Sequence, residues 1–221
     1  QIKDLKLEFD ENFKLKKDFK VVGDINTANI KISDKYEIKD LIANFLYEKN
    51  SLYLNQMSWN LNKPDSTEKE FFDGEAQLKQ GKKILNVDLK FKTKNASNFP
   101  KIPVINYYFS ENSISEIKTQ FIINKNKTLF LKKLIIEDND NKAEIRDLNL
   151  DKNYNLINFK EIHLRTSIDN NTNNEFKITN KDKIRIKGNV FDAKMLIKEL
   201  SKNNKENKFL KKISRDVEID F

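Results

Sequence analysis

Apolar and polar residues alternate along residues 114–190, and short clusters of Asn, Asp and Lys interrupt this alternation. A period of two places successive side chains on opposite faces of a strand, whereas Asn and Asp accept the left-handed backbone of tight turns. The predicted turns are 124–127, 137–141, 151–153, 169–174 and 180–182. The strands predicted between them are 114–123, 128–137, 142–150, 154–168, 175–179 and 183–190. Such short breaks predict that consecutive strands pair as an antiparallel meander.

The first half of the chain repeats this pattern. Alternating runs at 72–79 and 84–92 flank the turn sequence Gln80-Gly81-Lys82-Lys83 and predict a hairpin. A further strand is predicted at 52–61 and a loop at 64–69. Residues 95–103 hold two of the three Pro residues and are the predicted internal boundary. It separates a β-rich segment of a repeating groove, residues 1–96, from a meander, residues 97–221.

Two segments have the spacing of a helix instead. Ala193, Leu196, Ile197 and Leu200 follow the i, i+3, i+4, i+7 pattern, and Asp192 is suited to cap the first turn. This predicts a helix near 192–201. Apolar residues in 38–46 have the same spacing and predict a second short helix. The predicted fold is therefore mostly β: a long, curved antiparallel sheet, groove-like and built from repeats, with one or two short helices.

Composition favours amphipathic elements over continuous apolar segments. Charged residues make up 34% of the 221 residues and hydrophobic residues 38%. No run reaches the roughly 18 apolar residues of a membrane-spanning helix, and no signal sequence opens the chain. The first residue is Gln1, and both ends lie in charged, alternating runs. We interpret the chain as a piece of a longer polypeptide.

Candidate catalytic chemistry is scarce. His163 is the only histidine and there is no cysteine, so a histidine pair or a thiol nucleophile is absent from the sequence. Because His163 alternates with apolar residues, we expect it to lie on the polar side of a strand. No glycine-rich phosphate loop or nucleophile elbow is present. The sequence Asp138-Asn139-Asp140-Asn141 lacks the Gly and the final Glu of a calcium loop. We therefore expect no enzyme activity, no catalytic residue, no metal and no cofactor.

Net charge is +8, but the basic residues alternate with acidic ones instead of clustering on one face. This pattern disfavours a nucleic-acid partner. The alternation instead predicts one continuous apolar face, although the doubled Ile122-Ile123 and Ile135-Ile136 leave some orientations ambiguous. The residues predicted to line this face as a lipid groove are Ile123, Phe130, Leu134, Ile145, Leu164, Phe176, Ile178, Ile184 and Ile186. The sequence leaves open whether this face is an open groove or a closed core.

Residues 184–200 carry a family resemblance. The sequence Ile184-Arg185-Ile186-Lys187-Gly188 ends a strand, and Asp192-Ala193 then opens the predicted helix. Together with the preceding meander, this arrangement resembles the bacterial AsmA-like proteins, especially their long YhdP-type members. The likeness covers about residues 50–221 and includes no catalytic residues.

The resemblance implies a periplasm-spanning protein that is anchored in the inner membrane by a segment outside this chain. It further implies a groove that takes phospholipid acyl chains toward the outer membrane and supports envelope homeostasis. The alternative is a surface or periplasmic β-sandwich or solenoid that acts as a binding protein or adhesin. A membrane barrel and a nucleic-acid-binding sheet fit less well, because aromatic girdles and a clustered lysine face are not evident.

Overall fold

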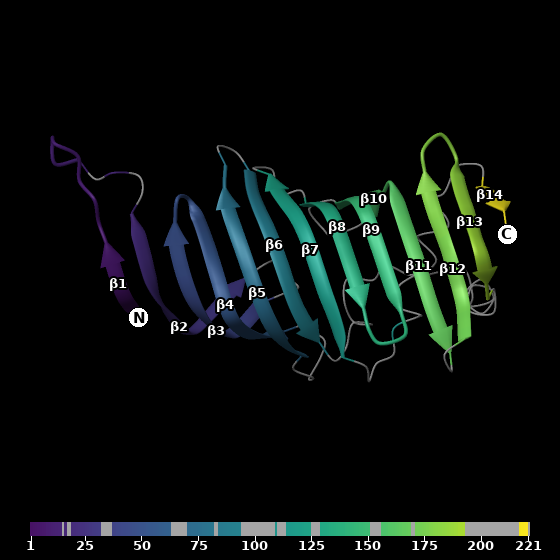
Figure 1. Cartoon of the computed structure of the whole chain (residues 1–221), viewed down its shortest axis with the longest axis horizontal. Helices are drawn as coiled ribbons and strands as arrows, with labels where there is room; N and C mark the ends of the chain where they lie inside the picture. Colours follow the sequence, from purple (N-terminus) through teal and green to yellow (C-terminus); the bar gives the residue numbers. More distant parts are fainter. Residues whose placement is uncertain are drawn as a thin grey trace.

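The described part of the chain is one sheet (Figure 1). A computed structural model describes residues 1–14, 16, 19–31, 37–62, 70–81, 84–93, 109, 114–124, 129–150, 156–168, 171–192 and 217–220. These residues contain fourteen strands and no helix. The strands are β1 (Ile2–Lys6), β2 (Lys20–Lys31), β3 (Glu37–Glu48), β4 (Ser51–Asn62), β5 (Glu70–Gln80), β6 (Ile84–Thr93), β7 (Ser115–Asn124), β8 (Leu129–Glu137), β9 (Lys142–Leu150), β10 (Leu156–Asn158), β11 (Glu161–Ile168), β12 (Asn171–Asn180), β13 (Ile184–Phe191) and β14 (Val217–Asp220).

The strands lie side by side in sequence order. The order runs from β1 to β9 and continues through β11, β12, β13 and β14, while β10 pairs only with β9. All described pairs are antiparallel except β13 with β14, which are parallel. Among the described strands, β1 and β14 occupy opposite edges, so the sheet is open. This confirms the predicted mostly β fold with one long antiparallel sheet.

Short turns explain the antiparallel order. Between β3 and β4 the chain reverses at Lys49 and Asn50, and both residues have positive φ, 47° and 61°. Two successive left-handed residues are the geometry of the type I′ hairpin turn, whose twist matches that of the flanking strands. Asn tolerates this conformation better than most residues other than glycine. An Asn-containing turn therefore forms here without a glycine.

The predicted strands at 114–123, 128–137, 142–150 and 183–190 agree closely with β7, β8, β9 and β13. Two other boundaries differ. The predicted strand 154–168 is divided into β10 and β11 at Phe159 and Lys160, where Phe159 turns into the core. The predicted turn 169–174 differs from the structure, in which residues from Asn171 onward belong to β12. Asn174 is buried there, and its side-chain amide bonds to Thr166 and to the backbone amide of Asp192.

The predicted helix at 38–46 is wrong, because this segment lies within β3. Asp40 has a positive φ of 54°, and the register with both neighbouring strands shifts at this point. An extra residue in a strand changes which parity faces the core. The core contacts residues of both parities: Ile38 before the shift, and Leu41, Ala43 and Phe45 after it. The spacing of these apolar residues therefore resembles that of a helix.

Several predicted features lie outside the described residues. These are the helix near 192–201 beyond Asp192, the loop at 64–69 and the boundary at 95–103. β6 and β7, on either side of that boundary, pair through ten residue pairs from Ile84–Asn124 to Thr93–Ser115. The sheet is thus continuous between the two halves of the chain.

Candidate functional site: an apolar and a charged face

One row of residues crosses the whole sheet on its apolar face. Directly opposite residues on paired strands share a face, so the register alone defines this row. We call it the central row: Ile2, Gly23, Phe45, Leu54, Ala76, Leu89, Thr119, Leu134, Ile145, Ile162, Ile178, Ile186 and Ile219. Thr119 is its only polar member. The row therefore gives thirteen described strands a nearly unbroken apolar surface.

Burial varies strongly along the central row. Ile145 in the middle is 1% exposed, whereas Ile2 on β1 and Ile219 on β14 are 62% and 63% exposed. Ile178 and Ile186 are half-buried and lie between the middle and the β14 edge. The apolar surface is thus covered in the middle and accessible at both edges.

Eight of the nine residues predicted to line the apolar face do lie on it. Leu134, Ile145, Ile178 and Ile186 belong to the central row. Leu164 pairs with Phe176 in the next row, while Ile123 and Ile184 lie further along the same face. The alternation of the sequence therefore located the face correctly at these positions.

Phe130 is the exception and lies on the opposite face. It pairs with Ile122, whereas Ile123 pairs with Leu129. The register of β7 with β8 shifts between Leu131 and Lys133, so the residues before and after Lys132 have opposite parity. Leu131, not Phe130, shares the apolar face with Leu134. The prediction for Phe130 was wrong because period-two alternation does not reveal an inserted residue.

Five of the predicted residues belong to a packed core in this structure. Leu134, Ile145, Leu164, Phe176 and Ile184 are all at most 6% exposed. A residue in a single sheet reaches such values only where other side chains cover the face. Phe109, from the segment between β6 and β7, is buried in the same cluster. Access of a lipid to these five positions stays a prediction.

A line of polar residues borders the core beside these apolar rows. Thr93 pairs with Ser115 across β6 and β7, and Thr166 pairs with Asn174 across β11 and β12; all four are buried. The Asn174 amide donates to Thr166 Oγ1 at 3.0 Å, and its Oδ1 accepts from the Asp192 amide at 2.9 Å. Alternation does not predict this border, because Asn174 lies in an Asn-rich run that resembles a turn and the other three residues are polar side chains facing the core.

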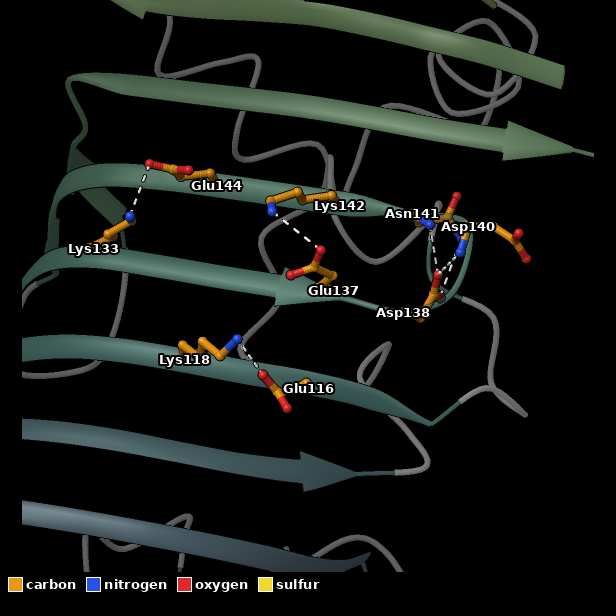
Figure 2. A network of polar contacts seen from close by, with 9 residues as sticks. All are labelled: Glu116, Lys118, Lys133, Glu137, Asp138, Asp140, Asn141, Lys142 and Glu144. Carbon is orange, nitrogen blue, oxygen red and sulfur yellow. Dashed lines mark hydrogen bonds and ion pairs between the residues drawn. The ribbon is translucent and has the colours of Figure 1, made fainter. Parts of the chain in front are cut away.

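The opposite face is charged and carries cross-strand ion pairs (Figure 2). Lys133 Nζ lies 3.6 Å from Glu144 Oε1, and Lys142 Nζ lies 3.2 Å from Glu137 Oε1. On β7, Lys118 pairs with Glu116. Opposite charges at neighbouring positions stabilise strand pairing only modestly at the surface, by about 0.2–1 kcal/mol each. Their main consequence is a face on which most charge is locally neutralised.

These pairs shift the ionisation of the acids. The hydrogen bond from Lys118 lowers the pKa of Glu116 below its usual value. Burial acts to raise the pKa of Glu144, but the hydrogen bond from Arg146 and the charges of Lys133 and Arg146 outweigh it, so that the pKa is lowered. Both acids are therefore held in the ionised form.

The charged face also holds a hollow of about 530 Å³ over β4 to β8. Its lining includes Tyr53, Glu75, Asp88, Lys90 and Lys133. Cations and carboxylates alternate around it, and Lys90 lies 3.8 Å from a carboxylate oxygen of Glu116. The hollow thus offers mixed polar contacts without a cluster of one charge sign.

The sequence candidates for chemistry lie on this charged side. His163 is exposed and pairs with Lys177 and Glu144 of neighbouring strands, as the alternation predicts for a polar-side histidine. Asp138 Oδ1 accepts the backbone amides of Asp140 and Asn141, so this carboxylate closes its own turn (Figure 2). The described residues contain no cluster of three or more potential metal-ligating side chains. Nor do they contain a helix long and apolar enough to cross a membrane.

Comparisons with protein-family models, with curated proteins and with solved structures found no match for this chain.

Proposed function

We propose that this chain is a non-enzymatic segment of an extended lipid-conducting sheet, of the kind that AsmA-like envelope proteins form. In this proposal the apolar face takes phospholipid acyl chains, and the full-length protein spans the periplasm toward the outer membrane. The inner-membrane anchor would belong to a segment outside this chain. The anchor, the location and the direction come from the resemblance of residues 184–200.

The central row is the observation that carries the proposal. Twelve strand-to-strand spacings of about 4.8 Å place Ile2 and Ile219 about 58 Å apart along the sheet. An acyl chain needs only nonspecific apolar contact, worth about 0.8 kcal/mol per buried methylene. A continuous row supplies that contact without a shaped pocket. Because both ends of the row are exposed, acyl chains have somewhere to enter and to leave.

The burial of the middle of the row favours the alternative function, a closed-core binding protein. Residues such as Ile145 contribute to stability by being sealed from water, and a sealed core conducts nothing. The two functions therefore differ in one respect, which is whether lipid contacts the row beyond its exposed ends.

Photo-crosslinking along the row separates them. A photoreactive residue is placed at Ile219, Ile186 or Ile145, which are exposed, half-buried and buried members of one row. The controls are exposed Ile42 and half-buried Ile135, which lie on the charged face. The full chain is illuminated with vesicles of phosphatidylethanolamine and phosphatidylglycerol, and lipid adducts are identified by mass spectrometry.

Lipid conduction predicts adducts at Ile219 and Ile186 well above their controls, with a measurable yield at Ile145. Adducts at Ile186 no more frequent than at Ile135 would contradict it. Crosslinks at Ile145 that capture only protein, together with unlabelled Ile186, favour the closed-core alternative.

A further inference from the structure

The chain that follows β1 projects beyond the sheet (Figure 1). Residues 7–14 of this segment carry exposed apolar side chains. Phe13 is 89% exposed, Phe9 52% and Leu7 43%. Leu7 and Phe9 are two residues apart in extended chain, so they point to the same side. An aromatic ring left this open to water forgoes about 1.5–3 kcal/mol of burial, a cost that needs an explanation.

The turn that presents Phe13 is ordered by its own hydrogen bonds. Asp10 Oδ1 accepts the backbone amides of Asn12 and Lys14, both at 2.9 Å. The Asp10 amide donates to the Lys14 carbonyl at 2.9 Å, and the Phe13 amide donates to the Asp10 carbonyl at 3.0 Å. Lys16 closes the base of the turn by donating its amide to the Glu8 carbonyl at 2.7 Å. The exposed ring is therefore held in place by a closed turn.

Phe13 is also strained in this turn. Its φ is 57°, in the left-handed region that bulky residues other than glycine rarely adopt. Asn would fit this conformation better and would remove the exposed ring. A bulky aromatic residue at a position that disfavours it indicates that its exposed side chain has a use.

We propose that the tip formed by residues 7–14 inserts Phe13, with Phe9 and Leu7, into the surface of a lipid bilayer. A specific protein partner requires an interface of about 1,000 Å² or more, which three side chains on a convex tip do not provide. A fluid acyl layer needs no complementary surface, and it accepts a turn whose backbone amides are already paired. This inference does not depend on lipid conduction by the sheet.

The charges around the tip suit a headgroup layer. The side chains of Lys6 and Lys16 are exposed beside the tip, where long lysine stems can lie against acyl chains while the ammonium groups reach the headgroups. The Glu8 carboxylate lies 3.3 Å from Lys6 and 3.9 Å from Lys16, and the Asp10 carboxylate is engaged by backbone amides. Asp10 is thus directed into the turn, Glu8 is paired with the two lysines, and Glu11 is the remaining acid of the tip and is exposed.

The test is flotation of the full chain with vesicles of equal parts phosphatidylcholine and phosphatidylglycerol. Phe13→Asn should reduce the partition coefficient about tenfold or more, because it removes the most exposed ring. Its urea midpoint should stay at or above that of the unmodified chain, since Asn relieves the backbone strain. The matched control is Ile157→Asn, which removes an isoleucine that is 63% exposed on β10, and it should leave binding unchanged.

A second measurement places the tip in the bilayer directly. In the Phe13→Trp variant, the fluorescence of the new Trp should be quenched by lipids brominated on their acyl chains. The quenching of buried Trp59 in the unmodified chain gives the background value. Equal binding by Phe13→Asn and the unmodified chain would overturn the proposal. So would loss of self-association in Phe13→Asn with no change in vesicle binding, which would make the tip a contact between copies. Lipid adducts at Ile186 test the sheet and leave this result unaffected.

Discussion

The same substitution should destabilise the chain much more at Leu131 than at its neighbour Phe130. Simple alternation places Phe130 on the apolar face, whereas the register of β8 places Leu131 there. Leu131 is 7% exposed and belongs to the core, and Phe130 is half-buried on the charged face. Replacing each residue with Asn therefore tests the inserted residue at Lys132.

The expected cost for Leu131→Asn follows from its burial. Loss of the buried leucine side chain costs about 2–3 kcal/mol. An amide without a hydrogen-bond partner in the core adds about 1–3 kcal/mol. The sum of about 4 kcal/mol is a large part of the 5–15 kcal/mol that stabilises a typical domain. Phe130→Asn should cost about 1 kcal/mol, because its ring keeps much of its contact with water and Asn remains hydrated there.

The assay is urea unfolding followed by circular dichroism and by the fluorescence of Trp59. Leu131→Asn should lower the midpoint strongly or prevent folding, while Phe130→Asn should shift it slightly with an unchanged slope. A Phe130→Asn variant that loses as much stability as Leu131→Asn would refute the register and restore the simple alternation.

Four further substitutions make three predictions about other parts of the sheet. Glu144→Gln should make stability fall less between pH 7 and about pH 3. The lowered pKa of Glu144 means that its ionised form stabilises the folded chain at neutral pH, and this contribution is lost as the pH falls through that pKa. Urea midpoints at both pH values measure the difference. Gly74→Ala should destabilise the chain, since its Cβ would clash with the backbone oxygen of Lys90 on β6. Gly81→Ala should be tolerated in thermal melts, because its Cβ comes closest to the Ile84 side chain, at 3.0 Å, and lies 3.4 Å from the Ile84 backbone oxygen. Asn174→Ala should cost about 1–3 kcal/mol in urea unfolding, because it removes a buried hydrogen bond to Thr166 and a partly buried one from the Asp192 amide.

The sequence predicted strands well where alternation was regular. On β6 and β7 every second residue faces the core as expected, and the predicted bounds nearly coincide with the observed ones. The errors fall where a strand contains an extra residue or where polar side chains are buried. Asp40 in β3 and Lys132 in β8 shift the parity, and Asn174 hides a strand inside an Asn-rich run. None of these leaves a period-two signal in the sequence.

The sequence predicts which residues form the apolar face, but it does not predict whether a lipid can reach that face. Alternation assigns a face to a side chain, and it assigned the apolar face correctly for residues such as Ile145 and Ile186. Whether that face is covered depends on contacts with residues far away in sequence, such as Phe109. The exposed turn at Phe13 was missed for another reason. The feature that marks this turn is the backbone φ of 57° at Phe13. A sequence does not predict it, because phenylalanine rarely adopts this conformation.

The parallel pairing of β14 has a different cause from the pairing of strands that short turns connect. Short turns force neighbouring strands to be antiparallel, but a connection as long as residues 192–216 permits either direction. In the observed register Ile219 lies beside Ile186, while Glu218 lies beside Arg185 and Asp220 beside Lys187. Lys187 Nζ is 3.2 Å from Asp220 Oδ2, and Arg185 Nε is 3.1 Å from Glu218 Oε2. A slip of one residue would move Ile219 to the charged face and both acids to the apolar face. The same alternation that gives each strand two faces therefore also selects the register in which a distant strand adds to the sheet.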